Sequence, residues 1–217
     1  MSQPATRTTR PRKRSTRGHP PWNVALLFPV QGEWTEDEYL ALENSGNRLI
    51  ELVDGAVEVL PMPDLFHQGI LQYLFRLLDD FARVTKREEA FLAPLPVRLG
   101  EKHMREPDLI FFKPQRIKNR RKLPEGADLV MEIVSPGKEN RDRDLKDKRK
   151  AYAKAKIPEY WIIDPEGQTI TTLTLGAKTY KVHGKYKPGD QASSKLLPGF
   201  TINVAEAFAA GLGRDHV

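Results

Sequence analysis

Two carboxylates stand in apolar, strand-like runs of the sequence, where a charge is costly unless a cation meets it. Glu132 interrupts the run "DLVMEIVS" (128–135), and Asp108 begins the run "DLIFF". Because side chains alternate along a strand, Glu132 shares a face with Val130 and Val134. If the two strands pair, the two acids repel each other. A divalent cation is the usual remedy, and oxygen ligands suit Mg²⁺ or Mn²⁺.

Each acid considered singly has an ordinary structural explanation. Asp108 can be a strand-entry residue held by backbone amides, and Glu132 can pair with an arginine of the core. The presence of both acids on consecutive strands favours a metal site over either explanation.

A third charged residue falls on the buried face of a predicted helix. In the helix expected over 141–155, Lys148 precedes Tyr152 by four residues and therefore lies in the apolar stripe. Asp144, one turn earlier, can orient its ammonium group. The alternatives are that Lys148 extends past the sheet edge into solvent, or that Arg149 faces inward instead.

Two acids and a lysine around a divalent metal suit the hydrolysis of a phosphodiester. The metal lowers the pKa of a bound water towards neutrality and offsets the charge that develops on the phosphate. The ammonium group holds the nucleophilic water or the transition-state oxygens. These residues therefore predict a metal-dependent hydrolase.

The elements that must position these groups alternate between helix and strand. Thr35 and Glu38 form a capping-box pair at the start of a helix over 34–46, and Asp54-Gly55 predicts a hairpin turn within 48–61. The remaining expected elements are a helix over 64–84, strands over 90–100, 106–113, 128–135 and 158–164, antiparallel strands over 168–204 with turns at Gly176, Gly184 and Pro188-Gly189, and a helix over 204–212. This order predicts an α/β fold in which helices flank a central mixed sheet, with an N-terminal hairpin and C-terminal antiparallel strands.

The excess positive charge is concentrated at the N-terminus. Residues 1–20 hold 6 of the 35 Lys and Arg residues and no acid, and the other 29 balance the 29 Asp and Glu residues. A segment rich in Pro, Thr, Ser and Arg cannot pack a core, so we expect a disordered basic tail over 1–32 and a single domain over 33–210. The tail can attract phosphate backbones or simply keep the chain soluble.

Composition excludes several classes of protein. The sequence has no cysteine, which excludes disulfides, thiolate metal sites and cysteine nucleophiles and is compatible with a reducing cytoplasm. No apolar run approaches the roughly 18 residues of a membrane helix. The segment "WNVALLFPV" resembles part of a signal peptide, but Asn23 and Pro29 interrupt it. We therefore expect a cytoplasmic protein without a membrane partner.

Two further residues have both a functional and a structural interpretation. Glu51 lies opposite Glu58 in the predicted hairpin, and such a like-charge pair requires a cation unless both acids lie on a solvated face. His67 shares a helical face with Ile70 and Leu71. His67 can approach the site, or it can be a histidine at the start of the helix whose hydrogen bonds are satisfied there.

The loop over 114–127 is basic and follows the strand of Asp108. Its cationic residues fit contacts with a nucleic-acid backbone, and an ordinary solvated loop explains them equally well. They are Arg116, Lys118, Arg120, Arg121 and Lys122. No motif that reads bases is visible, so no sequence specificity is predicted.

The spacing of these residues resembles known nucleases. "PD" at 107–108, followed by an acid within an apolar strand, resembles the PD-(D/E)XK nuclease superfamily. The runs "ELVDG", "HQGI", "APLPVRL", "PDLIFF", "DLVMEIVSPG", "KRKAYAKAKIPEYWIID" and "LPGF" resemble more closely the Uma-two family of restriction-endonuclease-like proteins, over about residues 33–208. The most specific part is "EIVSPG" followed by "EYWIID".

The resemblance implies a restriction-endonuclease-like fold and an Mg²⁺-dependent nuclease site. Asp108 and Glu132 match the metal carboxylates of the family, and the backbone carbonyl of Ile133 is implied as a third ligand. Glu51 matches an acidic position of the family, and His67 matches another family position.

One departure concerns the lysine. The superfamily pattern expects it two residues after the second acid, where this chain has Val134. In the Uma-two family the lysine lies on the following helix, where Lys148 matches. The position of Lys148 in the apolar stripe of the helix indicates the same residue, independently of the family resemblance.

We therefore expect a divalent-metal-dependent DNA endonuclease in which Asp108, Glu132 and Lys148 carry the reaction. The alternative is a catalytically silent nucleic-acid-binding or protein-interaction module on the same fold, which uses the tail and the basic loop. A homodimer is expected from function alone, because double-strand cleavage needs two sites.

Overall fold

The computed structural model describes residues 28–45, 49–85 and 88–213. Most of the predicted tail, residues 1–27, lies outside the described residues. The chain from Gln31 onward forms one compact unit. The boundary predicted at residue 32 stays a prediction.

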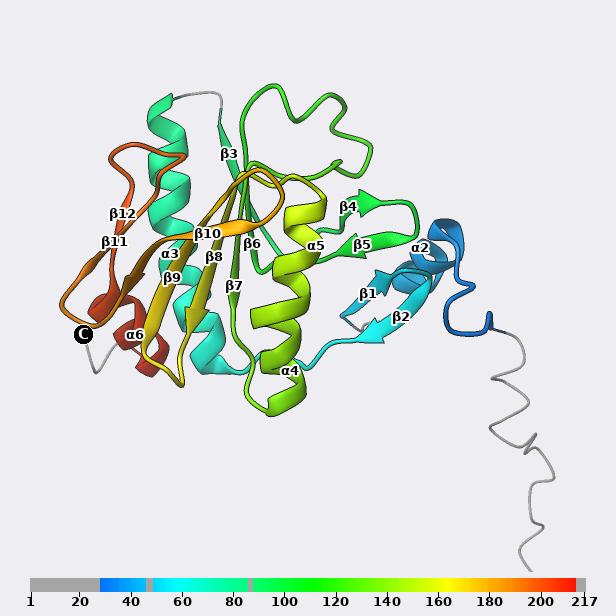
Figure 1. Ribbon diagram of the computed structural model, residues 1–217, viewed down its shortest axis with the longest axis horizontal. Coiled ribbons are helices and arrows are strands. Elements are labelled where there is room, and N and C mark those ends of the chain that lie inside the picture. Colours follow the sequence, from blue (N-terminus) through cyan, green and yellow to red (C-terminus); the bar gives the residue numbers. More distant parts are fainter. Residues whose placement is uncertain (1–27, 46–48, 86–87, 214–217) are drawn as a thin grey trace, which may run out of the picture. The chain divides into compact units, whose positions relative to one another are not determined.

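A six-stranded mixed sheet forms the centre of this unit, in the order β10-β9-β8-β7-β6-β3 (Figure 1). The strands are β3 (Glu89–Leu92), β6 (Leu109–Phe112), β7 (Leu129–Ile133), β8 (Glu159–Asp164), β9 (Thr169–Leu175) and β10 (Tyr180–Tyr186). The neighbours β7 and β8 run parallel, and the other neighbouring pairs run antiparallel. The predicted mixed sheet is confirmed.

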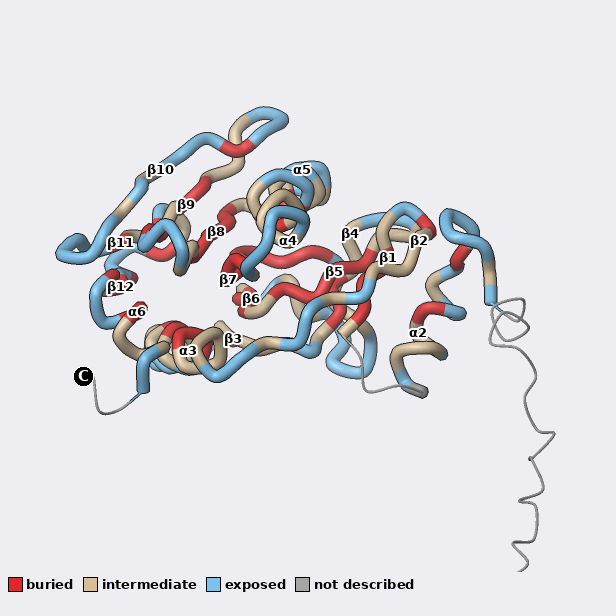
Figure 2. Tube along the Cα trace, turned by 90° about the horizontal axis from the view of Figure 1, so that it is seen from below, coloured by how far each residue is buried: buried red, intermediate tan, exposed pale blue. Residues whose placement is uncertain are grey.

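Helices cover both faces of this sheet (Figure 2). On one face lie α3 (Leu65–Thr85) and α6 (Val204–Leu212), packed against side chains such as Leu109 and Met131. On the other face lies a helical segment made of α4 (Lys138–Asp142), the π-helical turn η1 (Arg143–Asp147) and α5 (Lys148–Lys154). Its Tyr152 packs with Ile110 and Val130. The alternation of side chains along β6 and β7 thus separates two cores.

A second sheet, in the order β2-β1-β5-β4, lies beside the central one. It comprises β1 (Ile50–Val53), β2 (Ala56–Val59), β4 (Val97–Gly100) and β5 (His103–Arg105), and α2 (Glu36–Ser45) packs near β1. The predicted capping box is present, since the Thr35 amide donates to the Glu38 carboxylate at 2.9 Å. The predicted hairpin turn is also present, with positive φ at Asp54 and Gly55. A small pair, β11 (Gln191–Ser193) and β12 (Thr201–Asn203), precedes α6.

Two expected features are wrong. The strand expected over 90–100 is in fact two strands, β3 and β4, which belong to different sheets. Pro94 and Pro96 lie between them, and because proline cannot donate a ladder hydrogen bond the chain leaves one sheet and enters the other. Gly184 is not a turn but lies within β10, where a side chain would collide with the Tyr186 hydroxyl.

None of the helices in the described part of the chain has the length and apolar character that crossing a bilayer requires.

Candidate active site

The pairing of β6 with β7 brings the two predicted acids together. The strands run antiparallel with Leu109 opposite Met131. One residue further along this register, Asp108 lies opposite Glu132 and on the same face of the sheet. Directly opposite residues have Cβ atoms only about 5 Å apart, so the two carboxylates share one environment.

Asp108 is held by two donors. Its Oδ2 accepts a hydrogen bond from the Ile133 amide at 2.8 Å, and its Oδ1 lies 3.1 Å from His67 Nε2. Asp64 in turn accepts from the His67 amide at the start of α3, which places the imidazole. Although burial lowers the pKa of His67, its hydrogen bond to Asp108 raises that pKa above the ordinary value on balance.

The backbone next to Asp108 leaves one carbonyl without its usual donor. The Ile133 amide points to the β6 side, and in a strand the carbonyl of the same residue points to that side too. The register places Pro107 opposite Ile133, and proline has no N–H to give. The Ile133 carbonyl, the implied third metal ligand, therefore lacks its ladder partner.

Lys148 faces the acids. Its side chain is 4% exposed, and its Nζ lies 2.8 Å from Glu132 Oε2, 3.5 Å from Asp144 Oδ1 and 3.7 Å from Glu51 Oε1. The alternative in which Lys148 reaches solvent is therefore wrong. Arg149 does not take its place, because the Arg149 guanidinium donates to the Tyr180 carbonyl.

A π-helical turn lies directly before Lys148. The turn, η1, is flanked by α4 and α5, so the inward-facing stripe contains Asp144, Lys148 and Tyr152. Such turns inside α-helices occur frequently at functional sites. The helix was predicted to begin at Arg141, whereas it begins at Lys138, and no sequence pattern indicated the π turn.

Glu132 is bonded at both oxygens. Lys148 donates to Oε2, and the Tyr152 hydroxyl donates to Oε1. Burial raises the pKa of Glu132 to about 8. Lys148 opposes this rise, and the negative charges of Asp108 and Asp144 reinforce it, since the cluster holds more acid than base. The sequence interpretation took Tyr152 for an apolar residue, although its position four residues after Lys148 was a signal that it faces the same group.

Glu51 belongs to the same network and is fully buried. Glu51 lies opposite Glu58, as predicted. Because Glu51 is buried, the alternative in which both acids lie on a solvated face is wrong. The cation that this acid pair requires is the Arg105 guanidinium, whose Nη1 lies 2.5 Å from Glu51 Oε2 and 3.0 Å from Glu58 Oε2. Burial disfavours the charge of Glu51, yet Lys148 and Arg105 hold its pKa below the ordinary value. The sequence interpretation missed Arg105.

Comparison with known proteins adds the deciding observation. The model of the Uma2 family, described as "Putative restriction endonuclease", matches residues 36–205. The chain belongs to the Uma2 family. The resemblance predicted from the sequence is thereby confirmed.

The fold also has a solved counterpart. The chain is similar to a crystal structure of "a putative nuclease belonging to DUF820 from Anabaena variabilis ATCC 29413", with a TM-score of 0.67 and 20% sequence identity. The match covers 84% of this chain and 99% of that chain. At this identity the likeness shows the fold, which confirms the predicted restriction-endonuclease-like class. The comparison with curated proteins found no match.

The acids of this Uma2 chain have the donor chemistry of a magnesium site. Asp108, Glu132 and Asp144 line a small cavity of about 50 Å³, which is room for one or two water-sized groups. Their oxygens are the hard ligands that Mg²⁺ and Mn²⁺ prefer. Among the described residues no three His, Asp or Glu side chains are already arranged around a point that could hold a metal. The donor set fits, and a cation would compete with Lys148 and Tyr152 for Glu132.

Glu106 is a further buried acid of this Uma2 site that the sequence interpretation missed. It lines the same cavity, and its Oε1 accepts a hydrogen bond from the Tyr39 hydroxyl at 3.1 Å. Burial, reinforced by the charge of Glu43, raises the pKa of Glu106 to about 8. The folded protein therefore binds a proton at Glu106 in a pH range where the unfolded chain has released it.

Replacing Glu106 with glutamine should flatten the pH dependence of stability. Because the pKa of Glu106 is about 8 when folded and the ordinary value for a glutamate is 4.5, wild-type stability falls as the pH rises from about 4.5 to about 8. Glutamine keeps the shape without this penalty, so we expect Glu106→Gln to raise Tm by a few degrees more at pH 9 than at pH 5. Thermal unfolding of the metal-free protein measures this. The exposed Glu101→Gln is the control, and an equal shift at both pH values for Glu106→Gln would contradict the expectation.

The basic loop of the Uma2 chain lies away from the acids. It leaves β6 at the end opposite Asp108, and Lys113 follows Asp108 by five residues, roughly 16 Å along an extended strand. Two of its arginines have carboxylate partners: Arg116 bonds Asp128 at 3.0 Å and Arg120 pairs with Glu89. The other three predicted residues, Lys118, Arg121 and Lys122, are exposed.

Proposed function

We propose that this chain is a divalent-metal-dependent endonuclease that hydrolyses DNA phosphodiester bonds. The observation that carries the proposal is the position of Lys148, whose buried ammonium lies 2.8 Å from Glu132, the acid opposite Asp108. Membership of the Uma2 family supports a nuclease, and it leaves the metal and the substrate to be tested.

The proposed metal would be held by Asp108, Glu132 and the Ile133 carbonyl. When bound, it supplies an acidified water and offsets negative charge on the phosphate. The protein supplies the orientation of these ligands. His67 and the Ile133 amide fix the Asp108 carboxylate, as partners behind a ligand commonly do.

Lys148 is the proposed partner of the attacking water and of the phosphate oxygens. Asp144 lies one helical turn before it and 3.5 Å from its Nζ, which orients the ammonium. The Asp144 carboxylate is itself held by the Ser135 amide at 3.2 Å. Because the ammonium is already desolvated and fixed, it stabilises developing charge without first reorganising.

The alternative is a binding module without catalysis, and one observation favours it. Glu132 and Glu51 are already neutralised by Lys148 and Arg105, and Tyr152 completes the bonds of Glu132. Such a network is stable without a metal. This alternative predicts DNA binding that is sensitive to salt, indifferent to Mg²⁺ and unaffected by loss of the Glu132 carboxylate.

Asp108→Ala tests the proposal directly. We expect the wild type to bind Mg²⁺ or Mn²⁺ in a calorimetric titration and to cleave plasmid DNA. Asp108→Ala should weaken metal binding at least about tenfold, because a charged ligand is lost, with cleavage at limiting metal reduced in proportion. Cleavage that survives the substitution unchanged would exclude this site. Absent metal binding together with intact DNA binding would favour the module.

A further inference from the structure

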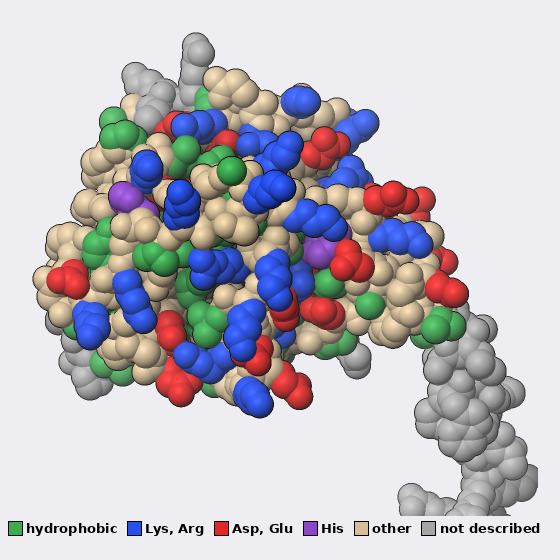
Figure 3. Space-filling model, in the orientation of Figure 1, with side chains coloured by type: hydrophobic (Ala, Val, Ile, Leu, Met, Phe, Trp, Pro, Cys, Tyr) green, Lys and Arg blue, Asp and Glu red, His purple; other side chains and the backbone are tan. Residues whose placement is uncertain are grey.

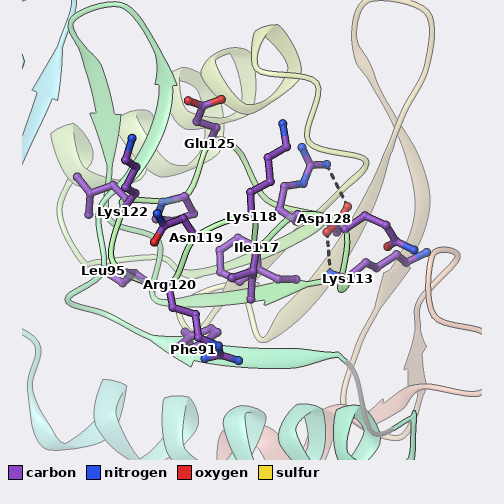
Figure 4. Close-up of a pocket in the computed structure, with 15 residues that line it drawn as sticks. Phe91, Leu95, Lys113, Ile117, Lys118, Asn119, Arg120, Lys122, Glu125 and Asp128 are labelled. Carbon is purple, nitrogen blue, oxygen red and sulfur yellow. Dashed lines mark hydrogen bonds and ion pairs between the residues drawn. The ribbon is translucent and has the colours of Figure 1, made fainter.

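A second cavity of about 610 Å³ lies between the loop that follows β6 and the edge strand β3 (Figure 4). Its volume falls within the range of roughly 300–1,000 Å³ that is usual for small-molecule sites. Neither Asp108 nor Glu132 lines it. The proposed nuclease chemistry therefore leaves this cavity without a role.

One side of the cavity is aromatic and apolar. Phe91 and Phe112 line it with their ring centroids 5.7 Å apart, and Ile117 and Leu95 extend the same surface. The side chains of Phe91, Ile117 and Leu95 are only partly buried. A planar apolar group can therefore reach them.

The other side of the cavity is cationic. Figure 4 shows Lys118 and Lys122 extending to one side, with Phe91 on the other. Both lysines are exposed, and no ion pair is formed by either within the described residues. Two acids line the wall: Asp128 pairs with Arg116 at 3.0 Å, and Glu125 lies 3.7 Å from the guanidinium of Arg98, which is outside the lining. The free charge of the cavity is thus positive, and the surrounding face is rich in Lys and Arg (Figure 3).

The cavity neighbours the candidate active site across one short segment. Phe91 and Leu95 line the large cavity, whereas Ala93 between them lines the small cavity that contains Asp108. The Ala93 amide donates to the Asp108 carbonyl at 3.1 Å, so this segment is fixed to the acid strand. One flexible polymer bound in the large cavity could therefore extend to the acid strand.

We propose that the large cavity binds an unpaired nucleotide of single-stranded DNA, on the same strand as the scissile phosphate. The base packs on Phe91 and Ile117, and the adjoining phosphates meet Lys118 and Lys122. An aromatic platform beside a basic groove is the usual means of holding an unpaired base, and a base stacked within a duplex cannot enter it. The substrate assignment rests on the proposed endonuclease function, whereas the binding site itself does not.

The test of the aromatic side is binding in EDTA, measured by fluorescence anisotropy of the full chain. We expect a labelled single strand to bind at least about tenfold more tightly than a blunt duplex of equal length, and Phe91→Leu to weaken the single strand about tenfold. Blunt-duplex affinity should stay unchanged in Phe91→Leu. Ile117→Ser, in the loop, gives a second variant if Phe91→Leu lowers Tm.

The test of the cationic side is the salt dependence of the same binding. Each phosphate contact contributes a slope of about 0.7 for single strands, so the double variant Lys118→Ala/Lys122→Ala should flatten the plot of log K against log salt by about 1.4. The matched control is Lys178→Ala/Lys185→Ala, which removes the same charge near and within β10, at the far edge of the sheet, and should leave the slope unchanged.

Three outcomes overturn the inference. They are a single-strand affinity insensitive to Phe91→Leu and Ile117→Ser, an equal salt slope for the two double variants, and a clear preference for RNA. If the cavity variants bind and cleave like the wild type, the inference fails and the endonuclease stands. If the protein never cleaves DNA but the cavity variants lose single-strand binding, the endonuclease fails and the nucleotide site stands.

Discussion

Replacing Lys148 with methionine is expected to lower the DNA cleavage rate at saturating Mg²⁺ by about 10²–10³-fold. Methionine keeps a long flexible side chain but removes the ammonium that lies 2.8 Å from Glu132 Oε2. A fixed donor that stabilises transition-state charge is worth a factor of this size in turnover. Initial rates on a plasmid, measured over a range of substrate concentrations, will show whether the loss falls on kcat rather than on binding.

The same helical segment provides matched controls. Lys146 and Lys150 are exposed and, within the part of the chain that the structure describes, their ion pairs are with the neighbours Asp142 and Asp147. Exposed pairs of this kind contribute little, so Lys146→Met and Lys150→Met should cleave within about twofold of the wild type. Lys148→Met/Glu132→Gln separates folding from catalysis, because it removes both members of the buried pair. We expect it to recover stability and not cleavage, and a Lys148→Met protein with wild-type turnover would remove Lys148 from the mechanism.

The position of Lys148 was predictable because helical spacing is a local property. Its distance of four residues from Tyr152 put it on the buried stripe, and the structure has it there. The hairpin register was predictable for the same reason, because Asp54-Gly55 fixes the pairing of Glu51 with Glu58. Local sequence patterns therefore predicted where the acid pair Glu51–Glu58 and Lys148 lie within their own elements.

What the sequence did not reveal depends on contacts between distant segments. Arg105 lies 54 residues from Glu51 along the chain, and nothing local marks it as the cation of that pair. Pro94 and Pro96 separate the two strands within 90–100, but which sheet each strand joins depends on the partner strand that it meets. Tertiary context decides both. The π turn before Lys148 has no sequence signal either.

Arg105→Met is expected to destabilise the protein by about 3–5 kcal/mol, the largest stability change that we predict. The Arg105 side chain is 2% exposed and its Nη1 bonds both Glu51 and Glu58. Removing the guanidinium leaves Glu51 fully buried with Lys148 3.7 Å away as its remaining cation, and an uncompensated buried charge carries a cost of this size. Urea unfolding of the metal-free protein measures the free energy. The control is Arg98→Met, whose 35%-exposed side chain pairs with Glu36 and should contribute no more than about 1 kcal/mol.

The uncompensated charge of Glu51, rather than the lost packing of Arg105, should account for most of the stability that Arg105→Met loses. If so, Arg105→Met/Glu51→Gln will recover more than half of the lost stability, because glutamine stays bonded to the Glu106 amide without carrying a charge. The two substitutions would then be strongly non-additive, as contacting residues are. If the effects simply add, Arg105 stabilises this sheet by packing alone. Glu51 would in that case tolerate burial through Lys148, and the acids of the site would depend on that lysine for their balance of charge.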